Sequence, residues 1–173
     1  AADSSSVPFW VSTAFEADRE ATLDSVENWE ELCNQLDAHR RSNNLFAAIR
    51  IEGIFDQIHY RVACKSADGT DLVTATRQQA EFTLRGCRGS LMGFWSPTYA
   101  RTLNIPGYHL HLISSDHHHG GHVLNIQAKN LTLQIMDINH FVMALPESPL
   151  FLTADLSGDP SAALQKAEGP LPT

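Results

Sequence analysis

The chain has 173 residues, the length of one ordinary domain, and 43% of them are hydrophobic, enough to form a core. Its formal net charge is −8 and it has no cluster of Lys and Arg, which argues against binding to nucleic acid. No apolar run is long enough to cross a bilayer, and no charged-then-apolar leader opens the chain. We therefore expect one domain over residues 1–173, with no membrane partner and with its location, cytoplasmic or secreted, left open.

The three cysteines are Cys33, Cys64 and Cys87, an odd number at wide spacing. They form neither a disulfide framework nor a cysteine-based zinc site. Their positions on apolar helix and strand patterns instead predict small, buried side chains.

The first third of the chain predicts one main helix between strands. An apolar run at Val7–Phe15 predicts a strand. Apolar residues at helical spacing predict a helix over Glu27–His39, capped by Asp24 or Ser25. Leu45–Glu52 and Ile54–Cys64 then read as two strands that turn at Gly53.

The remaining chain predicts further strands and short helical pieces. Strands are expected at Gln79–Leu84, Gly89–Trp95, His109–Ile113, Val123–Ala128, Leu131–Ile138 and Phe141–Leu145, with a turn at Lys129-Asn130. Short helices are expected after Ser96-Pro97, over Ser148–Leu156 and over Ala162–Glu168. The predicted class is α+β: β-rich, with mixed sheets and one main helix.

Three histidines within this region indicate a metal site. Alternate side chains of a strand share one face, so His109 and His111 project together. Gly120 and Gly121 permit a turn that can bring His122 beside them on the next strand. An H-x-H pair alone is usually incidental, but three imidazoles without a fourth protein ligand are typical of a catalytic zinc site with an open position.

A run of further histidines, His117–His119, lies between Asp116 and the two glycines. Its side chains alternate in direction and its neighbours are turn residues. We expect a solvent-facing loop there rather than additional ligands.

Several motifs then resemble one known family. Asn44–Gly53 (NLFAAIRIEG), Arg88–Pro97 (RGSLMGFWSP), Gly107–His111, Gly120–Leu124 and Leu131–Ile135 are similar to motifs of α-acetolactate decarboxylases, in the same order. The resemblance extends from about Val7 to Glu168, nearly the whole chain.

The resemblance implies a reaction and a set of residues. These enzymes convert (S)-2-acetolactate to (R)-acetoin and carbon dioxide with Zn²⁺ held by three histidines. The matching ligands would be His109, His111 and His122. The arginine of the family's active site matches Arg61, which follows His59-Tyr60, and a C-terminal glutamate that reaches into the site matches Glu168.

Without the resemblance, Arg61 reads as an ordinary arginine on a strand surface and Glu168 as an exposed residue of the tail. Glu52 reads as a hairpin residue rather than a catalyst. The family also carries a preceding segment with another active-site glutamate, which this chain lacks. We therefore expect an incomplete N-terminal subdomain, whose exposed strand edges favour a homodimer.

Two interpretations other than this enzyme stay open. The first is a truncated, catalytically impaired relative that binds zinc and hydroxy-keto acids or diols without turnover. A cupin-like iron oxygenase would also use H-x-H on a strand, but it usually adds a nearby carboxylate, and here only Asp116 is available.

Overall fold

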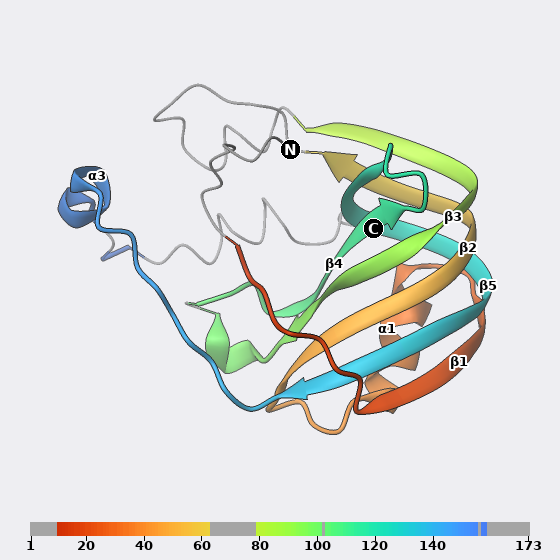
Figure 1. Ribbon diagram of the computed structural model, residues 1–173, viewed down its shortest axis with the longest axis horizontal. Helices are drawn as coiled ribbons and strands as arrows, with labels where there is room; N and C mark the ends of the chain where they lie inside the picture. The colour runs from red at the N-terminus through yellow and green to blue at the C-terminus, as the bar shows by residue number, and fades with distance from the viewer. Residues whose placement is uncertain (1–9, 63–78, 102, 156, 159–173) are drawn as a thin grey trace.

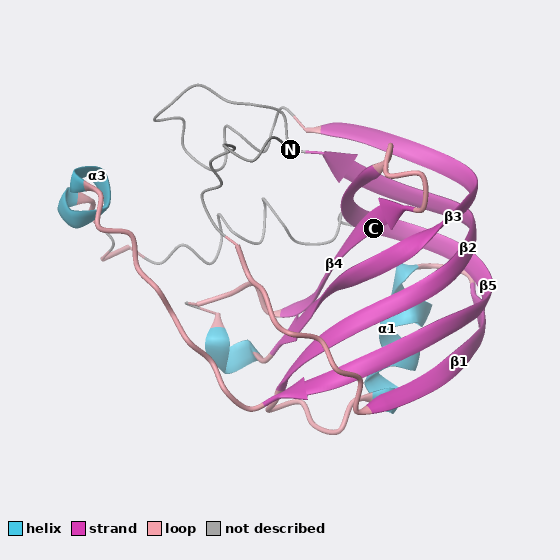
Figure 2. Ribbon diagram, in the orientation of Figure 1, coloured by secondary structure: helices cyan, strands magenta, loops and turns pink. Residues whose placement is uncertain are grey.

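The computed structural model describes residues 10–62, 79–101, 103–155 and 157–158. Five strands and one main helix account for most of this part (Figures 1 and 2). In chain order the elements are β1 (Arg19–Val26), α1 (Trp29–His39), β2 (Phe46–Val62), β3 (Ala80–Ser96), the 3₁₀ turn η1 (Thr98–Ala100), β4 (Gly107–Ser114), β5 (Gly120–Ile138) and α3 (Pro149–Thr153). The predicted β-rich α+β class with one main helix is confirmed.

The strands form one antiparallel sheet in the order β1-β5-β2-β3-β4. The start of β5 also pairs with β4, so that β2, β3, β4 and β5 form a closed ring at that end. The sequence predicts mixed sheets, but every strand pair in the described part is antiparallel. Because β5 is a single long strand that pairs with β1, β2 and β4, the strands form one sheet instead of several.

Three expected breaks are bends inside long strands. β2 continues through Gly53, where an added Cβ would lie only 2.6 Å from Leu131 Cδ2, so glycine permits the close approach of β5. β5 continues through Asn130, which takes a left-handed φ of 53°. β3 likewise continues through Gly86, at a φ of 61°. The sequence predicts turns at Gly53 and at Lys129-Asn130, and a break at no named residue between positions 84 and 89, but each strand continues through these positions without reversing the chain.

Two expected strands, Val7–Phe15 and Phe141–Leu145, are not found in the described residues, which do not include 7–9. Residues 10–15 have no regular secondary structure, and the first strand, β1, follows them. Phe141–Leu145 is also irregular and leads away from the sheet to α3 (Figure 1). Ala162–Glu168 lies outside the described residues.

The main helix begins slightly later than predicted. Its N-cap is Asn28, whose side chain accepts a hydrogen bond from the Glu31 backbone, rather than Asp24 or Ser25. Asn is a preferred N-cap because its oxygen satisfies one of the free amide groups of the first turn.

The core lies between α1 and one face of the sheet. Leu32 and Leu36 of α1 are fully buried in a cluster with apolar side chains of all five strands. Each such leucine contributes roughly 2 kcal/mol by its burial. On β4 the core side chains are Leu110 and Leu112, so the odd-numbered residues of this strand face the other way. No helix among the described residues has the length and apolarity to span a membrane.

Candidate metal centre

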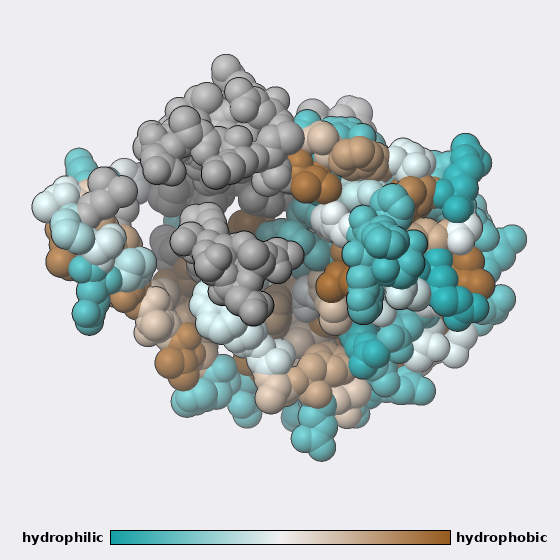
Figure 3. Space-filling model, turned by 45° about the horizontal axis from the view of Figure 1, so that its top comes forward, coloured by the Kyte–Doolittle hydropathy of each residue, from teal (hydrophilic) through white to brown (hydrophobic). Residues whose placement is uncertain are grey.

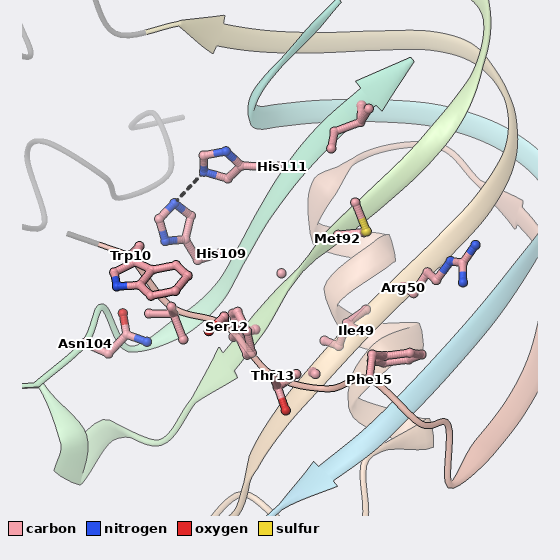
Figure 4. A pocket seen from close by; sticks show the side chains of 15 residues that line it. Trp10, Ser12, Thr13, Phe15, Ile49, Arg50, Met92, Asn104, His109 and His111 are labelled. Carbon is pink, nitrogen blue, oxygen red and sulfur yellow. Dashed lines mark hydrogen bonds between the residues drawn. The ribbon is translucent and has the colours of Figure 1, made fainter. Parts of the chain in front are cut away.

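The histidines occupy the face of the sheet opposite the core. His109 and His111 alternate with the buried Leu110 and Leu112, so they project together from β4 (Figure 4). His122 stands near the start of β5, directly opposite His111 in the strand pairing. The predicted convergence of these three residues is present.

Their geometry fits one metal ion. One nitrogen from each ring lies within 4.8 Å of the others. The Nε2 atoms of His109 and His111 are 3.1 Å apart. Zinc–nitrogen bonds of about 2.05 Å at a tetrahedral angle require neighbouring nitrogens about 3.3 Å apart. The observed spacing is close to this value for His109 and His111, and the three residues are the only such group among the described residues.

The surroundings keep the imidazoles neutral. Burial lowers the pKa of His109 to about 4 and that of His122 to about 2, and the neighbouring histidines and the Arg61 cation add to both shifts. Desolvation and the Arg61 charge also lower the pKa of His111. A neutral imidazole has the free lone pair that a metal needs, so the donor set suits a divalent cation.

The turn between β4 and β5 allows this convergence. A Cβ on Gly121 would lie 2.4 Å from the Arg61 carbonyl oxygen, so glycine lets β5 approach β2 at the metal centre. Ser114 and Asp116 organise the loop through a side-chain hydrogen bond. His117–His119 are exposed, as predicted, although His119 Nδ1 lies 3.2 Å from the Tyr60 hydroxyl.

The structure brings Arg61 to the histidines. Arg61 pairs with His122 across β2 and β5, and only 7% of its surface is exposed. It is therefore not an ordinary surface arginine, as it reads without the family resemblance. Glu52 is bound by Arg50 and Ser90, which agrees with a structural role. Glu168 lies outside the described residues.

A cavity of about 620 Å³ adjoins His109 and His111. Residues of the irregular N-terminal segment, among them Trp10 and Phe15, form one side of it (Figure 4). Arg50 and Met92 line it from the sheet, and the strand pairing aligns them with His111 in neighbouring strands. Sequence reasoning missed these lining residues. Strand alternation places Arg50 on one face of β2, but only the register shows that this is the histidine face.

The fold and the site together define the class: an antiparallel β-protein with a candidate site for a single metal ion, formed by three neutral imidazoles beside a cavity. The sequence model of the family described as alpha-acetolactate decarboxylase matches residues 1–158. The chain therefore belongs to the alpha-acetolactate decarboxylase family, which confirms the resemblance seen in its motifs.

Two relatives show the extent of the match. The alpha-acetolactate decarboxylase of Brevibacillus brevis is 35% identical over 167 residues, which cover 96% of this chain and 59% of the relative. The enzyme of the same name from Methanosarcina mazei is 35% identical over 162 residues, 93% of this chain and 56% of the relative. The chain thus spans less than two thirds of the length of these relatives.

Solved structures agree. The crystal structure of alpha-acetolactate decarboxylase from Bacillus subtilis strain 168 superposes with a TM-score of 0.85 at 29% identity, over 90% of this chain and 67% of that one. A Staphylococcus aureus protein of unknown function, similar to alpha-acetolactate decarboxylase, gives a TM-score of 0.82 at 25% identity, over 90% of this chain and 66% of that one.

Proposed function

We propose that this chain, as one acetolactate-decarboxylase-like domain over residues 1–173, converts (S)-2-acetolactate to (R)-acetoin and carbon dioxide with Zn²⁺. The convergence of His109, His111 and His122 carries the proposal, because three neutral ligands leave the cation its full charge and an open face. Membership of the family supports the decarboxylation of acetolactate.

The substrate carries a ketone next to a tertiary alcohol that bears the carboxylate. When the carbon–carboxylate bond breaks, its electron pair must move towards the ketone oxygen. Bound zinc would supply a Lewis acid that stabilises this developing negative charge. The three imidazoles would hold the cation, and the adjoining cavity of about 620 Å³ is large enough for such a small molecule.

Arg61 is the candidate to orient the charged groups of the substrate. Its guanidinium is a planar cation that can hold a carboxylate through two hydrogen bonds. Its burial removes much of the screening by water, so its charge acts strongly on its neighbours. Burial is the main cause of the lowered pKa of each histidine, and the Arg61 charge adds to it, which supports a location of Arg61 close to the reacting groups.

The carbon that loses carbon dioxide must then receive a proton on one face. We propose Glu168 as the residue that delivers it, on the basis of the matching glutamate in the family. A carboxyl group suits this step when it is partly shielded from water, because its pKa then rises towards neutrality.

Acetoin formation tests the proposal. Zinc-loaded protein should release acetoin from racemic acetolactate, a chelator should abolish the reaction, and added zinc should restore it. The Bacillus subtilis relative serves as the positive control. Absence of acetoin from protein that demonstrably binds zinc would refute the proposed activity of this chain.

A zinc-binding relative without turnover is the second candidate. The observation in its favour is that the convergence of three histidines accounts for zinc binding whether or not turnover follows. Such a protein would bind zinc and a hydroxy-keto acid or diol without releasing carbon dioxide. Equal specific activity of this chain and a full-length relative would exclude it.

We also propose that the chain forms a homodimer. β1 pairs only with β5 among the described strands, so its other edge offers free backbone groups to a second copy. The end that carries α3 stands apart from the rest of the molecule in Figure 3. The segment between β5 and α3 has exposed apolar side chains, among them Val142 and Leu145, which offer a second contact surface away from the β1 edge (Figure 1). Light scattering after size exclusion should give twice the chain mass, and a monomer at micromolar concentration would contradict the proposal.

A further inference from the structure

The three candidate ligands are not held equally by the sheet. His111 and His122 are partners in the pairing of β4 with β5, so the strand ladder fixes their separation. That pairing covers only His111–Ile113 on β4. His109 lies beyond its end, and its only strand partner is Phe94 on β3. The position of His109 relative to the other two ligands must therefore depend on something besides the β4–β5 ladder.

The neighbouring residue, Tyr108, is anchored on the opposite face of β4. Its hydroxyl donates a hydrogen bond to Asp37 Oδ1 at 2.6 Å and accepts one from Arg40 Nε at 2.7 Å. Its ring packs on Trp95, with the ring centroids 4.7 Å apart. Burial raises the pKa of Tyr108, so the hydroxyl remains a donor throughout the physiological range.

Arg40 connects this anchor to the main helix. It is the C-cap of α1, and its backbone amide donates to the Leu36 carbonyl. Its side chain is only 2% exposed, and its guanidinium carbon lies 3.5 Å from the centroid of the Trp95 ring. A buried cation stacked on an indole and bonded to a tyrosine is a rigid arrangement. The end of α1, the end of β3 and the start of β4 are therefore joined at one point.

The contact of β3 with β4 at this point is also tight. A Cβ on Gly93 would lie 1.9 Å from the His109 carbonyl oxygen, so the two backbones lie closer here than any other residue would allow. Rotation or lifting of the first residues of β4 would break this contact and the Tyr108 hydrogen bonds together. Since Tyr108 and His109 are adjacent and point to opposite faces, a strand fixed through one is fixed through the other.

We propose that Asp37, Arg40, Trp95 and Tyr108 form a positioning cluster for His109, which sets the distance between this ligand and the His111–His122 pair. The inference rests on the proposed function, because it takes His109 to be a metal ligand. None of the four residues touches the metal or the substrate. They act through the backbone of β4 alone.

Cobalt binding tests the proposal, since Co²⁺ replaces zinc in nitrogen sites and its visible absorption reports the ligand geometry. Tyr108→Phe keeps the ring and removes both hydrogen bonds of the hydroxyl. We expect its Co²⁺ affinity to fall about tenfold, at the lower end of what loss of an outer hydrogen bond costs a metal site, with a changed visible spectrum. Tyr99→Phe is the matched control, because Tyr99 is exposed and its hydroxyl donates only to the Asn44 carbonyl. It should leave affinity and spectrum unchanged.

A second variant guards against a general loss of structure. Asp37→Asn changes a half-exposed side chain and leaves the Tyr108 ring in place, and it should weaken Co²⁺ binding in the same direction. If Tyr108→Phe lowers the melting temperature but binds Co²⁺ with wild-type affinity and spectrum, the cluster is merely structural and this inference fails alone. If the wild-type protein binds no Co²⁺, the proposed metal site fails and the inference fails with it.

Discussion

Arg61 on β2 and His122 on β5 face each other across paired antiparallel strands. Both are buried, with 7% and 9% of their surfaces exposed. A cation and an imidazole so placed cannot both be charged at low energetic cost, because water does not screen them. Burial chiefly keeps His122 neutral and ready to bind a metal, and the arginine adds to this effect, while its own positive charge remains available to an anionic substrate.

Replacement of Arg61 should separate metal binding from turnover. Arg61→Ala removes the proposed contact to the substrate but none of the imidazoles, so zinc stoichiometry should stay at wild-type level. Acetoin formation should fall about 100-fold or more, as is usual when a charge-stabilising donor is lost. Metal analysis and a kinetic assay measure the two effects. Arg85→Ala, at an exposed arginine of β3, is the control, and loss of zinc from the Arg61 variant would show that its role is misassigned.

Replacement of one ligand should release the metal. His109→Ala leaves only two imidazoles, and two neutral ligands hold zinc far more weakly than three. We expect bound zinc to fall from about one ion per chain to nearly none after dialysis. His118→Ala, in the exposed loop between β4 and β5, is the matched control and should retain zinc. Zinc loss from the His118 variant with retention by the His109 variant would mean that the loop, not the triad, holds the ion.

The site could be foreseen from the sequence because its signals are local. Strand alternation places His109 and His111 on one face whatever the rest of the fold does. The position of His122 needed only a turn, which two glycines supply. Arg61 was different: its place beside His122 depends on the register of β2 with β5, which no local pattern records, so only the family resemblance pointed to it.

The errors in the fold have the opposite cause. Glycine locally favours a turn at position 53. In the structure Gly53 instead lies inside a continuous strand, where the lack of a side chain makes room for Leu131, a residue far along the chain. Asn130 similarly takes a left-handed conformation without ending β5. The apolar residues of the N-terminal segment read as a strand, but Trp10 and Phe15 line a cavity instead of joining the sheet. Tertiary contacts decided each case.

Zinc should stay bound to this triad at a lower pH than it would at a site of histidines with ordinary pKa values. Protons compete with zinc only below the pKa of the free ligand, and those of His109 and His122 lie at about 4 and about 2 instead of 6.5. Affinity should therefore stay nearly constant from pH 8 through pH 6.5, where a site of ordinary histidines begins to weaken, and release should come only well below pH 6. Equilibrium dialysis across this range measures the effect. Half-release at or above pH 6.5 would contradict the neutral, buried state of the triad.

The metal-free protein should lose stability over a related range. At pH above 6.5 the histidines are neutral in both the folded and the unfolded chain. Below pH 6.5, His109 and His122 become protonated in the unfolded chain but stay neutral in the folded chain. The free energy of unfolding therefore falls by about 1.4 kcal/mol for each of them with every pH unit of acidification. Urea titrations between pH 7 and 5 test this. The slope should be smaller in His122→Phe, and an equal slope would refute the assignment.

The tight contact of β3 with β4 can be tested by adding one methyl group. In Gly93→Ala the new Cβ would meet the His109 carbonyl oxygen, which is backbone and cannot rotate away, so β4 must move off β3. We expect a loss of about 2 kcal/mol, which is roughly 4–8 °C in melting temperature, together with weaker zinc binding. Gly158→Ala, where an added Cβ meets nothing within 4 Å, is the control. A Gly93 variant as stable as wild type would show that β4 is free to shift, and His109 with it.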